Sequence, residues 1–559
     1  MIPLAESVGT YEKFEVVVEL DADFINPYDP TELRLDARFT SPSGQSVTVP
    51  GFYYRDFELD LSGTRDRVTP TGESSWRVRF APDEAGEWSY RVLATTLASG
   101  TVRSSSQTFT VTESDDPGFV RIDPRNPRYL AFDDGTPYFA VGENMGWYGS
   151  GGMVDYRDWL DALHASGGNF IRVWMPAWGF GIEWNDTGLG NYDARQDEAF
   201  RLDTLMEMAD ERDIYIMLTL INHGQYSTST NPEWDSNPYN AANGGPLEAP
   251  GDFATNPEAR KLWNQRLRYI AARWGYSTNI MAWEWWNEIN WTQLVNSDLL
   301  TPWVERSTAY LKTVDPYNHL ITHSGSPVGD EAVWTQMDFV QDHRYDPPDL
   351  IMDFARVIAN WVELYPDQPF LMGEFGSPSE YDLNGTLVHI GLWAAPMNGA
   401  FGTGMTWWWD NYIHPNDLYY LFSAVVAFFG DEDLAAYDYQ PTAVTINREA
   451  RSRVFGMQTE NRALLWVVSK QYSENQLLKQ YTKNLRDGVE NPLDITFPDV
   501  EGGVLTLVGM VDGDYTLEWW NTFTGEIDHT ITVTVSGGTA DVSVPVFSTD
   551  WAIKIFPVA

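Results

Sequence analysis

The segments IMAWEWWNE (280–288) and PFLMGEFG (369–376) are both mostly apolar, and each carries a glutamate at or near its end. Short runs rich in branched and aromatic residues are typical of strands buried on both faces of a parallel sheet. Amphipathic helical patterns separate most of these runs, as in VDYRDWLDALHAS and PEARKLWNQRLRYIAARW. Six more runs of the same kind are YFAVGEN (138–144), NFIRVWM (169–175), IYIMLTL (214–220), HLITHS (319–324), FVQDHRY (339–345) and FGTGMTWWWD (401–410). Eight units over about 300 residues predict a (β/α)8 TIM barrel, which we place at residues 116–435.

Both flanks of this segment show the period-two alternation of antiparallel strands. Before it, runs such as SWRVRF and EWSYRVLATT lie between turn clusters, which predicts an immunoglobulin-like β-sandwich at residues 1–115. After it, runs such as ALLWVVSK and WAIKIFP predict a C-terminal β-sandwich at residues 436–559. We expect QYSENQLLKQYTKNLRDGVENP to be a polar insertion in that last domain.

Composition excludes several classes of protein. The 559 residues are 43% hydrophobic and 21% charged, the balance of a folded multidomain protein and not of a disordered one. With no cysteine, thiol catalysis and cysteine-ligated metals are excluded. The net charge of -44 would repel nucleic acids and anionic membranes, so we expect neither as a partner. The oligomeric state is left open.

Other features narrow the chemistry further. The histidines show no HExxH pair, and no GxSxG elbow lies between a strand and a helix. We therefore expect neither a catalytic metal nor a cofactor. No stretch approaches the length of a membrane span, and the start, MIPLAESVGTYEKFEV, lacks the order of a secretory signal. We expect a secreted, extracellular bacterial protein whose signal has been removed, with the cytoplasm as the alternative.

The two strand-end glutamates suggest a reaction. Side chains at the carboxyl ends of barrel strands meet over one mouth, so Glu288 and Glu374 are predicted to face each other there. A pair of carboxyl groups suits cleavage of an acetal, because one donates a proton to the leaving oxygen while the other attacks or stabilises the anomeric carbon. The predicted reaction is glycoside hydrolysis.

With these motifs, the barrel segment resembles the retaining glycoside hydrolases of clan A, in particular family-five-like enzymes. In that group the acid/base is the Glu of an Asn-Glu pair ending strand four, which matches Asn287 and Glu288, and the nucleophile ends strand seven, which matches Glu374. The resemblance also implies substrate-binding or orienting roles for further residues, namely Arg172, His223, Asn287, His343, Tyr345 and a strand-eight tryptophan, here Trp408. The N-terminal sandwich and the C-terminal β-domain also look like those that flank such barrels.

Other residues have less specific signals. We expect Glu284, inside an apolar strand, to be the buried partner of an arginine or histidine, and Glu143 to line the pocket or to be a buried barrel carboxylate. Asp410 and Trp178 are candidates for contact with a sugar hydroxyl and a sugar ring. The long segments 176–196 and 222–255 follow strand ends and are expected to shape the cleft.

The sequence thus predicts a retaining glycosidase in which Glu374 attacks and Glu288 is the acid/base, its pKa raised by burial and neighbouring negative charge. Two alternatives remain open. One is transglycosylation at the same site, and the other is a non-catalytic carbohydrate-binding protein with a degenerate barrel. The sugar, its linkage, and endo or exo action are not determined by these patterns.

Overall fold

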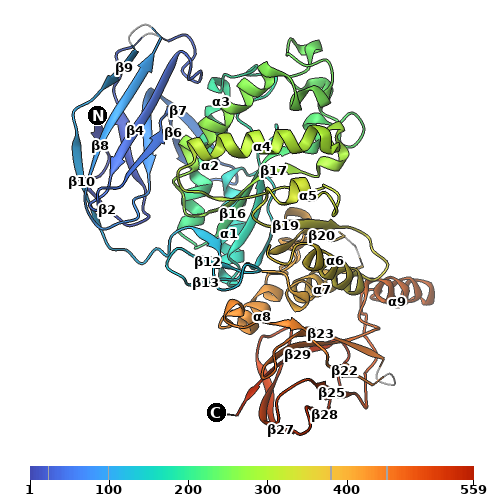
Figure 1. The fold of residues 1–559 in the computed structure, drawn as a ribbon. Coiled ribbons are helices and arrows are strands. Elements are labelled where there is room, and N and C mark those ends of the chain that lie inside the picture. Colours follow the sequence, from blue (N-terminus) through green and yellow to red (C-terminus); the bar gives the residue numbers. More distant parts are fainter. Residues whose placement is uncertain (23, 98–99, 378–380, 448–450, 559) are drawn as a thin grey trace.

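The computed structural model describes every residue except 23, 98–99, 378–380, 448–450 and 559 (Figure 1). Figure 1 shows β-sheets at the N-terminal end, a central region of alternating strands and helices, and further β-sheets at the C-terminal end. The fold is therefore multidomain, with an α/β region between two all-β regions. Within the described residues, no helix combines the length and the apolar character that a membrane span requires.

The N-terminal region consists of two sheets packed face to face. The first has the order β1 (Ile2–Pro3), β3 (Phe14–Val18), β7 (Arg67–Phe80), β6 (Phe52–Asp60). The second has the order β2 (Ser7–Gly9), β10 (Gln107–Thr112), β8 (Gly86–Thr96), β4 (Leu33–Thr40), β5 (Ser46–Pro50), with β9 (Gly100–Arg103) paired to β8. Alternate residues of each strand, such as Phe14, Phe39 and Phe109, point inward and form one aromatic core.

The central region carries the parallel strands. A small antiparallel sheet of β11 (Val120–Ile122), β12 (Leu130–Phe132) and β13 (Pro137–Tyr138) leads into it. Five strands then pair in chain order, namely β14 (Gly142–Asn144), β15 (Phe170–Trp174), β16 (Tyr215–Asn222), β17 (Ile280–Asn287) and β18 (Leu320–Thr322). Two more parallel strands, β19 (Val340–Arg344) and β20 (Phe370–Phe375), pair with each other. Seven of the eight predicted runs thus contain a parallel strand.

Helices alternate with these strands. They are α1 (Met153–Ala165), α2 (Gln196–Asp210), α3 (Pro257–Trp274), α4 (Ser297–Val314), α5 (Glu331–Trp334), α6 (Leu350–Leu364), α7 (Thr386–Ala394) and α8 (Tyr420–Phe429). The sequence signal was clearest for α3, where Pro257 takes the first helical position and the Asn256 side chain accepts hydrogen bonds from the backbone of Glu258 and Ala259.

The eighth predicted strand, 401–410, is wrong as a regular strand. The segment makes isolated parallel bridges instead, from Gly402 to Ala140 and from Thr406 to both Glu143 and Phe375. A Cβ on Gly402 would lie 2.3 Å from the carbonyl oxygen of Ala140, so the close approach of the two chains requires glycine. The segment nevertheless lies between β20 and β14. Hydrogen bonds also join β18 to the start of β19, since Asp338 N donates to Ile321 O at 2.8 Å.

The C-terminal region again has two sheets. One has the order β21 (Gln440–Pro441), β23 (Ser452–Gln458), β24 (Ala463–Ser469), β29 (Asp550–Pro557), β26 (Gly513–Trp520), β27 (Ile527–Val535), and the other has the order β22 (Thr445–Ile446), β25 (Val504–Val508), β28 (Thr539–Ser543). The predicted polar insertion forms helix α9 (Glu474–Asp487), in which only Leu477 is buried. It protrudes at the side of the molecule in Figure 1.

Buried ion pairs join the N-terminal sheets to the helices of the central region. Arg79 on β7 donates to Glu15 Oε2 at 2.6 Å and to Asp203 Oδ1 of α2 at 2.7 Å. Arg273 of α3 binds the same Asp203, with Nη2 2.7 Å from Oδ2. Burial acts to raise the pKa of Asp203, but the charges of Arg273 and Arg79 outweigh it and lower that pKa. The carboxylate therefore stays ionised between two guanidinium groups from different domains.

We expect the change Asp203→Asn to destabilise the protein strongly, because it leaves two buried guanidinium groups with reduced compensation, a loss of about 3–5 kcal/mol for a broken buried pair. Thermal unfolding followed by circular dichroism measures the effect. The pair of Asp186 and Arg195, 2.8 Å apart, provides the control, since the Asp186 side chain is 50% exposed and Asp186→Asn should cost at most about 1 kcal/mol. Equal unfolding temperatures for the two variants would contradict this view of the interface.

Candidate active site

Three ionisable side chains meet at the carboxyl ends of the parallel strands. Glu288 directly follows β17, His343 lies in β19, and Glu374 is the register partner of His343 in β20. One carboxylate oxygen or ring nitrogen from each residue lies within 4.8 Å of the others. Glu374 is 4% exposed, and the Glu288 side chain is 20% exposed. The arrangement brings two carboxyl groups and one imidazole within reach of a single ligand atom.

Arg172 on β15 makes hydrogen bonds to this cluster and to the residues next to it. Its side chain is fully buried, and its Nη1 donates to Glu374 Oε1 at 2.5 Å and to Asn144 Oδ1 at 3.1 Å. Its Nη2 donates to Asn287 Oδ1 at 2.7 Å. One guanidinium group thus orients both Glu374 and the amide next to Glu288.

Glu284 neutralises the other side of the same guanidinium. Arg172 Nε donates to Glu284 Oε2 at 2.7 Å and its Nη2 to Oε1 at 2.9 Å, a bidentate pair with no exposed atom on either side chain. Thr219 and Gln341 also donate to the Glu284 carboxylate. This is the buried arginine partner that the sequence analysis expected, and it places Glu284 away from the cluster's open side.

Ring nitrogens of two histidines and one tryptophan lie close to the Glu288 carboxylate. His343 Nδ1 lies 3.1 Å from Glu288 Oε1, and Trp291 Nε1 donates to Oε2 at 3.1 Å. His223 Nδ1 lies 3.9 Å from Oε2 and also contacts the Asn287 amide at 3.0 Å. Both predicted histidines are therefore at the site, with His343 much the closer to the carboxylates.

The backbone of Glu288 is strained. It has φ 49° and ψ 56°, a left-handed conformation that a glutamate adopts at a cost of roughly 1–3 kcal/mol. The backbone amide donates to Ser324 Oγ at 2.9 Å, which helps to fix the turn. Gly325 packs behind it, since a Cβ there would lie 2.8 Å from Glu288 Cα. The turn aims the carboxylate out of the strand toward His343.

The predicted raised pKa of Glu288 is wrong for this arrangement. Burial acts to raise it, but the hydrogen bond and charge of His343, with the charges of His223 and Arg172, outweigh burial and lower the pKa of Glu288 to about 2. The prediction considered the negative neighbour and omitted the cation between the two carboxylates. Glu288 is therefore ionised while His343 carries a proton.

The pKa values of the other residues in the cluster are raised, in contrast to that of Glu288. Burial acts to lower the pKa of His343, but the charges of Glu374 and Glu288 and the hydrogen bond to Glu288 raise it above 6.5. Burial raises the pKa of Glu374, with His343, Arg172 and Tyr345 opposing that rise. Tyr345, whose hydroxyl donates to Glu374 Oε2 at 2.6 Å, has its own pKa raised by burial and by that carboxylate. The directions of these shifts favour a proton on His343 over one on Glu288.

Tryptophans form a wall beside the cluster. Trp147 packs against Trp174, Trp178 and Trp407 with ring centroids 5.4, 5.3 and 5.9 Å apart, and Trp178 is 47% exposed. Trp408 has φ 70°, and a Cβ on Gly376 would lie 3.4 Å from its Cδ1, which places it beside the chain that follows Glu374. Both predicted tryptophans, Trp178 and Trp408, therefore lie on the side of segment 401–410.

Two predicted residues lie apart from the pair. Glu143 on β14 is fully buried, and among the described residues neither of its oxygens has a hydrogen-bond partner. Burial raises its pKa well above the usual range, and the charge of Asp410 adds to the shift, so it is neutral. Asp410 is exposed, and no hydrogen bond or ion pair within the described residues links either acid to Glu288 or Glu374. We expected Glu143 either to line the pocket or to be a buried barrel carboxylate, and its burial fits the second of these roles.

Several residues that contact the site were not predicted from the sequence. Asn144, Gln341, Ser324 and Thr219 contact the core residues described above, and Trp291 donates to Glu288. Gln341 lies two residues before His343 on the same strand, so strand alternation could have placed both on one face. No comparable signal marks Ser324, which follows β18.

We expect His343 to stay protonated above pH 6.5 and to lose part of this shift in Glu288→Gln, which removes a negative charge and weakens the hydrogen bond. Titration of ¹⁵N-labelled imidazole resonances measures this directly. The resonances of His414, which contacts Tyr419 and not the cluster, serve as the internal reference for the spectra of both proteins. An unchanged His343 titration in the variant would contradict the proton placement.

Comparison with known proteins adds three findings. Residues 7–95 match a family model described as a domain of unknown function, DUF5060. Mannan endo-1,4-beta-mannosidase F of Aspergillus fumigatus is 27% identical over 242 residues, which are 41% of this chain and 50% of that protein. Mannan endo-1,4-beta-mannosidase A of Aspergillus aculeatus is 26% identical over 257 residues, 43% of this chain and 63% of that protein. The chain thus spans about half to two thirds of these curated relatives.

Solved structures extend the likeness to the whole fold. A candidate glycoside hydrolase from Bacteroides vulgatus covers 99% of this chain and 100% of its own, with TM-score 0.64 and 15% identity. A glycoside hydrolase family 5 structure from the same species covers 79% of this chain and 94% of its own, with TM-score 0.51 and 14% identity. The resemblance to family-five-like glycoside hydrolases that the motifs indicated is therefore confirmed as a likeness of sequence and of fold.

Proposed function

We propose that this protein is a retaining glycoside hydrolase that cleaves β-linked sugars, with Glu374 as the nucleophile and Glu288 as the acid/base. The observation that carries the proposal is the juxtaposition of Glu288, His343 and Glu374, whose polar atoms lie within 4.8 Å of one another. Retaining enzymes hold their two carboxyl groups about 5–5.5 Å apart, whereas inverting enzymes need roughly 6.5–9.5 Å to admit a water molecule. The close spacing favours direct attack by a carboxylate.

The surroundings of Glu374 support its role as nucleophile. Both of its oxygens accept hydrogen bonds, one from the Arg172 guanidinium at 2.5 Å and one from the Tyr345 hydroxyl at 2.6 Å. Hydrogen bonds to the charged form favour ionisation against the effect of burial. The two donors also fix the direction in which the carboxylate faces.

The proton for the leaving group comes from the cluster itself. In the free site His343 carries it and donates it to Glu288 across 3.1 Å, so a shift along this hydrogen bond produces the protonated acid. Glu288 then protonates the glycosidic oxygen as Glu374 attacks the anomeric carbon, the C–O bond breaks, and a glycosyl ester forms on Glu374. In the second step Glu288 takes a proton from water, the hydroxyl attacks the anomeric carbon, and Glu374 is released.

The relatives suggest a first substrate. The curated proteins that match this chain are named mannan endo-1,4-beta-mannosidases, so we propose a β-1,4-linked mannan as the substrate class to test first. Trp178, 47% exposed, and the partly exposed Trp147 and Trp407 offer apolar ring surface on which pyranose rings stack, whereas Trp174 is buried. The strong negative charge of the chain suits a neutral polysaccharide.

We also propose the domain assignment on which this function rests. Residues 116–435 form the catalytic (β/α)8 barrel with segment 401–407 in the eighth strand position, residues 1–115 an immunoglobulin-like sandwich, and residues 436–559 a C-terminal sandwich. Separate apolar cores in the first and last segments support these divisions, as do the bridges of Thr406 to Glu143 and Phe375. Secretion remains part of the proposal.

We expect Glu374→Gln to lower the rate of β-1,4-mannan hydrolysis by several orders of magnitude, because the amide cannot form the glycosyl ester. Glu288→Gln should cost about 10²–10⁴ in kcat, with a much smaller loss on an aryl glycoside whose leaving group needs no proton. Reducing-sugar and aryl-release assays measure both, and NMR of the first product shows whether the anomeric configuration is retained.

The exposed Glu363→Gln is the matched control and should retain full activity. A fluoro-sugar inactivator that labels a carboxylate other than Glu374 would overturn the assignment, as would an inverted product. Products longer than the substrate at high acceptor concentration would instead indicate transglycosylation, and binding without turnover would indicate a non-catalytic barrel.

The pH profile provides an independent test. The pKa of His343 is raised, so the mobile proton is present below that pKa and is lost as the pH rises through it, which should produce an alkaline limb in kcat/KM above pH 6.5. In His343→Asn the proton can lie only on carboxyl groups, so the limb should move to lower pH. A limb at the same pH in both proteins would contradict a proton shared with His343.

A further inference from the structure

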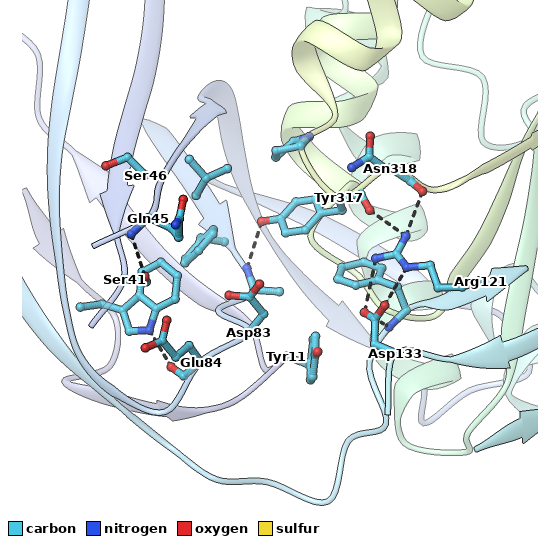
Figure 2. Close-up of a pocket in the computed structure, with 16 residues that line it drawn as sticks. Tyr11, Ser41, Gln45, Ser46, Asp83, Glu84, Arg121, Asp133, Tyr317 and Asn318 are labelled. Atoms are coloured by element: carbon cyan, nitrogen blue, oxygen red, sulfur yellow. Dashed lines mark hydrogen bonds and ion pairs between the residues drawn. The ribbon is translucent and has the colours of Figure 1, made fainter. Parts of the chain in front are cut away.

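A cavity of about 510 Å³ lies between the N-terminal sandwich and the central region (Figure 2). One wall comes from the sandwich, including Ser41, Gln45, Asp83 and Trp88, and the facing wall comes from Phe119, Arg121 and Tyr317. Tyr317 and Asn318 directly precede β18, at the amino ends of the parallel strands. The cavity is therefore at the end of the central region opposite to Glu288 and Glu374.

Aromatic rings make up much of its lining. Tyr317 stacks on Phe119 with centroids 5.0 Å apart, Tyr11 meets the edge of Phe119 at 6.1 Å, and Phe80 packs on Trp88 at 5.1 Å. The rings are fixed in position, because the Tyr317 hydroxyl accepts a hydrogen bond from Ala81 N at 3.1 Å and Trp88 Nε1 donates to Glu84 O at 2.7 Å. The accessible aromatic surface of the cavity comes from Tyr11 of the sandwich and Tyr317 of the central region, which are partly exposed, whereas Phe80, Trp88 and Phe119 are buried.

Several polar side chains that line the cavity have no hydrogen-bond partner among the described residues. Within the part of the chain that the structure describes, no hydrogen bond engages the carboxylates of Asp83 and Glu84, the side-chain amides of Gln45 and Asn318, or the hydroxyl of Tyr11. Figure 2 shows these side chains around the same hollow. By contrast, Arg121 is fully occupied, donating to Asp133 at 2.7 Å and to the backbone of Tyr317 and Asn318.

The mixture of groups indicates the class of ligand. A cation would need only acceptors, yet the amides of Gln45 and Asn318 and the hydroxyl of Tyr11 present donors as well. A sugar hydroxyl both donates and accepts, and the faces of a pyranose ring pack on aromatic rings. A volume of about 510 Å³ is within the usual range of small-ligand sites, which occur preferentially between domains.

We propose that this cavity is a second carbohydrate-binding site, which binds one or two sugar units of a neutral polysaccharide between the sandwich and the barrel. Asp83 and Glu84 accept hydrogen bonds from the sugar, Gln45 and Asn318 donate to it, and Tyr11 and Tyr317 contact its ring. The sandwich, whose residues 7–95 match a domain of unknown function, thereby gains a binding role. The choice of a sugar rests in part on the proposed function.

The position gives this site a different task from the cluster of Glu288 and Glu374. A sugar at the opposite end of the strands cannot be the one that is cleaved. A second attachment point instead raises the effective concentration of the polymer near the enzyme, so it favours long or insoluble chains over short ones.

The test uses the full-length chain carrying Asp83→Asn and Glu84→Gln, which keep the shape of both side chains but remove their charge. Glu58→Gln with Glu73→Gln is the matched control, since both lie exposed on the other sheet of the sandwich. In a Glu374→Gln background, calorimetric titration with manno-oligosaccharides should show two binding events for the control and one for the cavity variant. With Glu374 intact, the cavity variant should hydrolyse insoluble mannan at least 3-fold more slowly and an aryl oligoglycoside at the control rate.

The outcomes separate this proposal from the catalytic one. Two unchanged binding events in the cavity variant would overturn the second site while leaving hydrolysis untouched. If the cavity variant loses one binding event but the protein with Glu374 intact hydrolyses nothing, the second site stands and the catalytic proposal is overturned. Spermidine that saturates the cavity while cello- and manno-oligosaccharides do not would replace the sugar with a cationic ligand and contradict the assignment.

Discussion

The buried guanidinium group of Arg172 is the interaction on which the rest of the site depends. It is a charge with no exposed atom, and such a charge persists in a protein only when carboxylates and amide oxygens compensate it. Glu284 compensates one edge, and Glu374, Asn287 and Asn144 accept from the other atoms. These partners come from three strands, β14, β17 and β20, so the charge of Arg172 on β15 can be satisfied only when the strands are correctly in register. The arginine therefore links the assembly of the parallel sheet to the geometry of the two proposed catalytic groups.

Most of this site could be predicted from the sequence because strand ends are a strong positional signal. Glu288, Glu374, His343 and Tyr345 end or follow apolar runs and Arg172 lies within one, and the structure brings all five together. The rest depends on contacts that no periodicity contains. The low pKa of Glu288 arises mainly from His343, whose ring nitrogen lies 3.1 Å away on a strand two units along the chain, together with the charges of His223 and Arg172.

The fold was predictable to a similar degree and for similar reasons. Alternation and apolar runs marked seven parallel strands and the strands of both flanking regions, whereas the eighth run makes only isolated bridges. Gly402 and Gly404 lie inside it, and glycine weakens a strand because it has no side chain to pack. We expected the polar segment in the C-terminal region to be an insertion, and within it the structure has helix α9, of which only Leu477 is buried. Its residues Leu477, Tyr481 and Leu485 recur every four positions, a helical spacing that the prediction did not use.

The neutral carboxyl group of Glu143 has a consequence for the conditions that suit this fold. Its pKa is raised in the folded chain by burial, so folding is accompanied by the uptake of a proton at this residue when the solution is above the usual pKa of a glutamate. Its contribution to stability is complete in acid, below that ordinary pKa, and declines as the pH rises toward the raised value. The fold is in this respect suited to mildly acidic surroundings, and alkali would force a negative charge into the wall of the barrel.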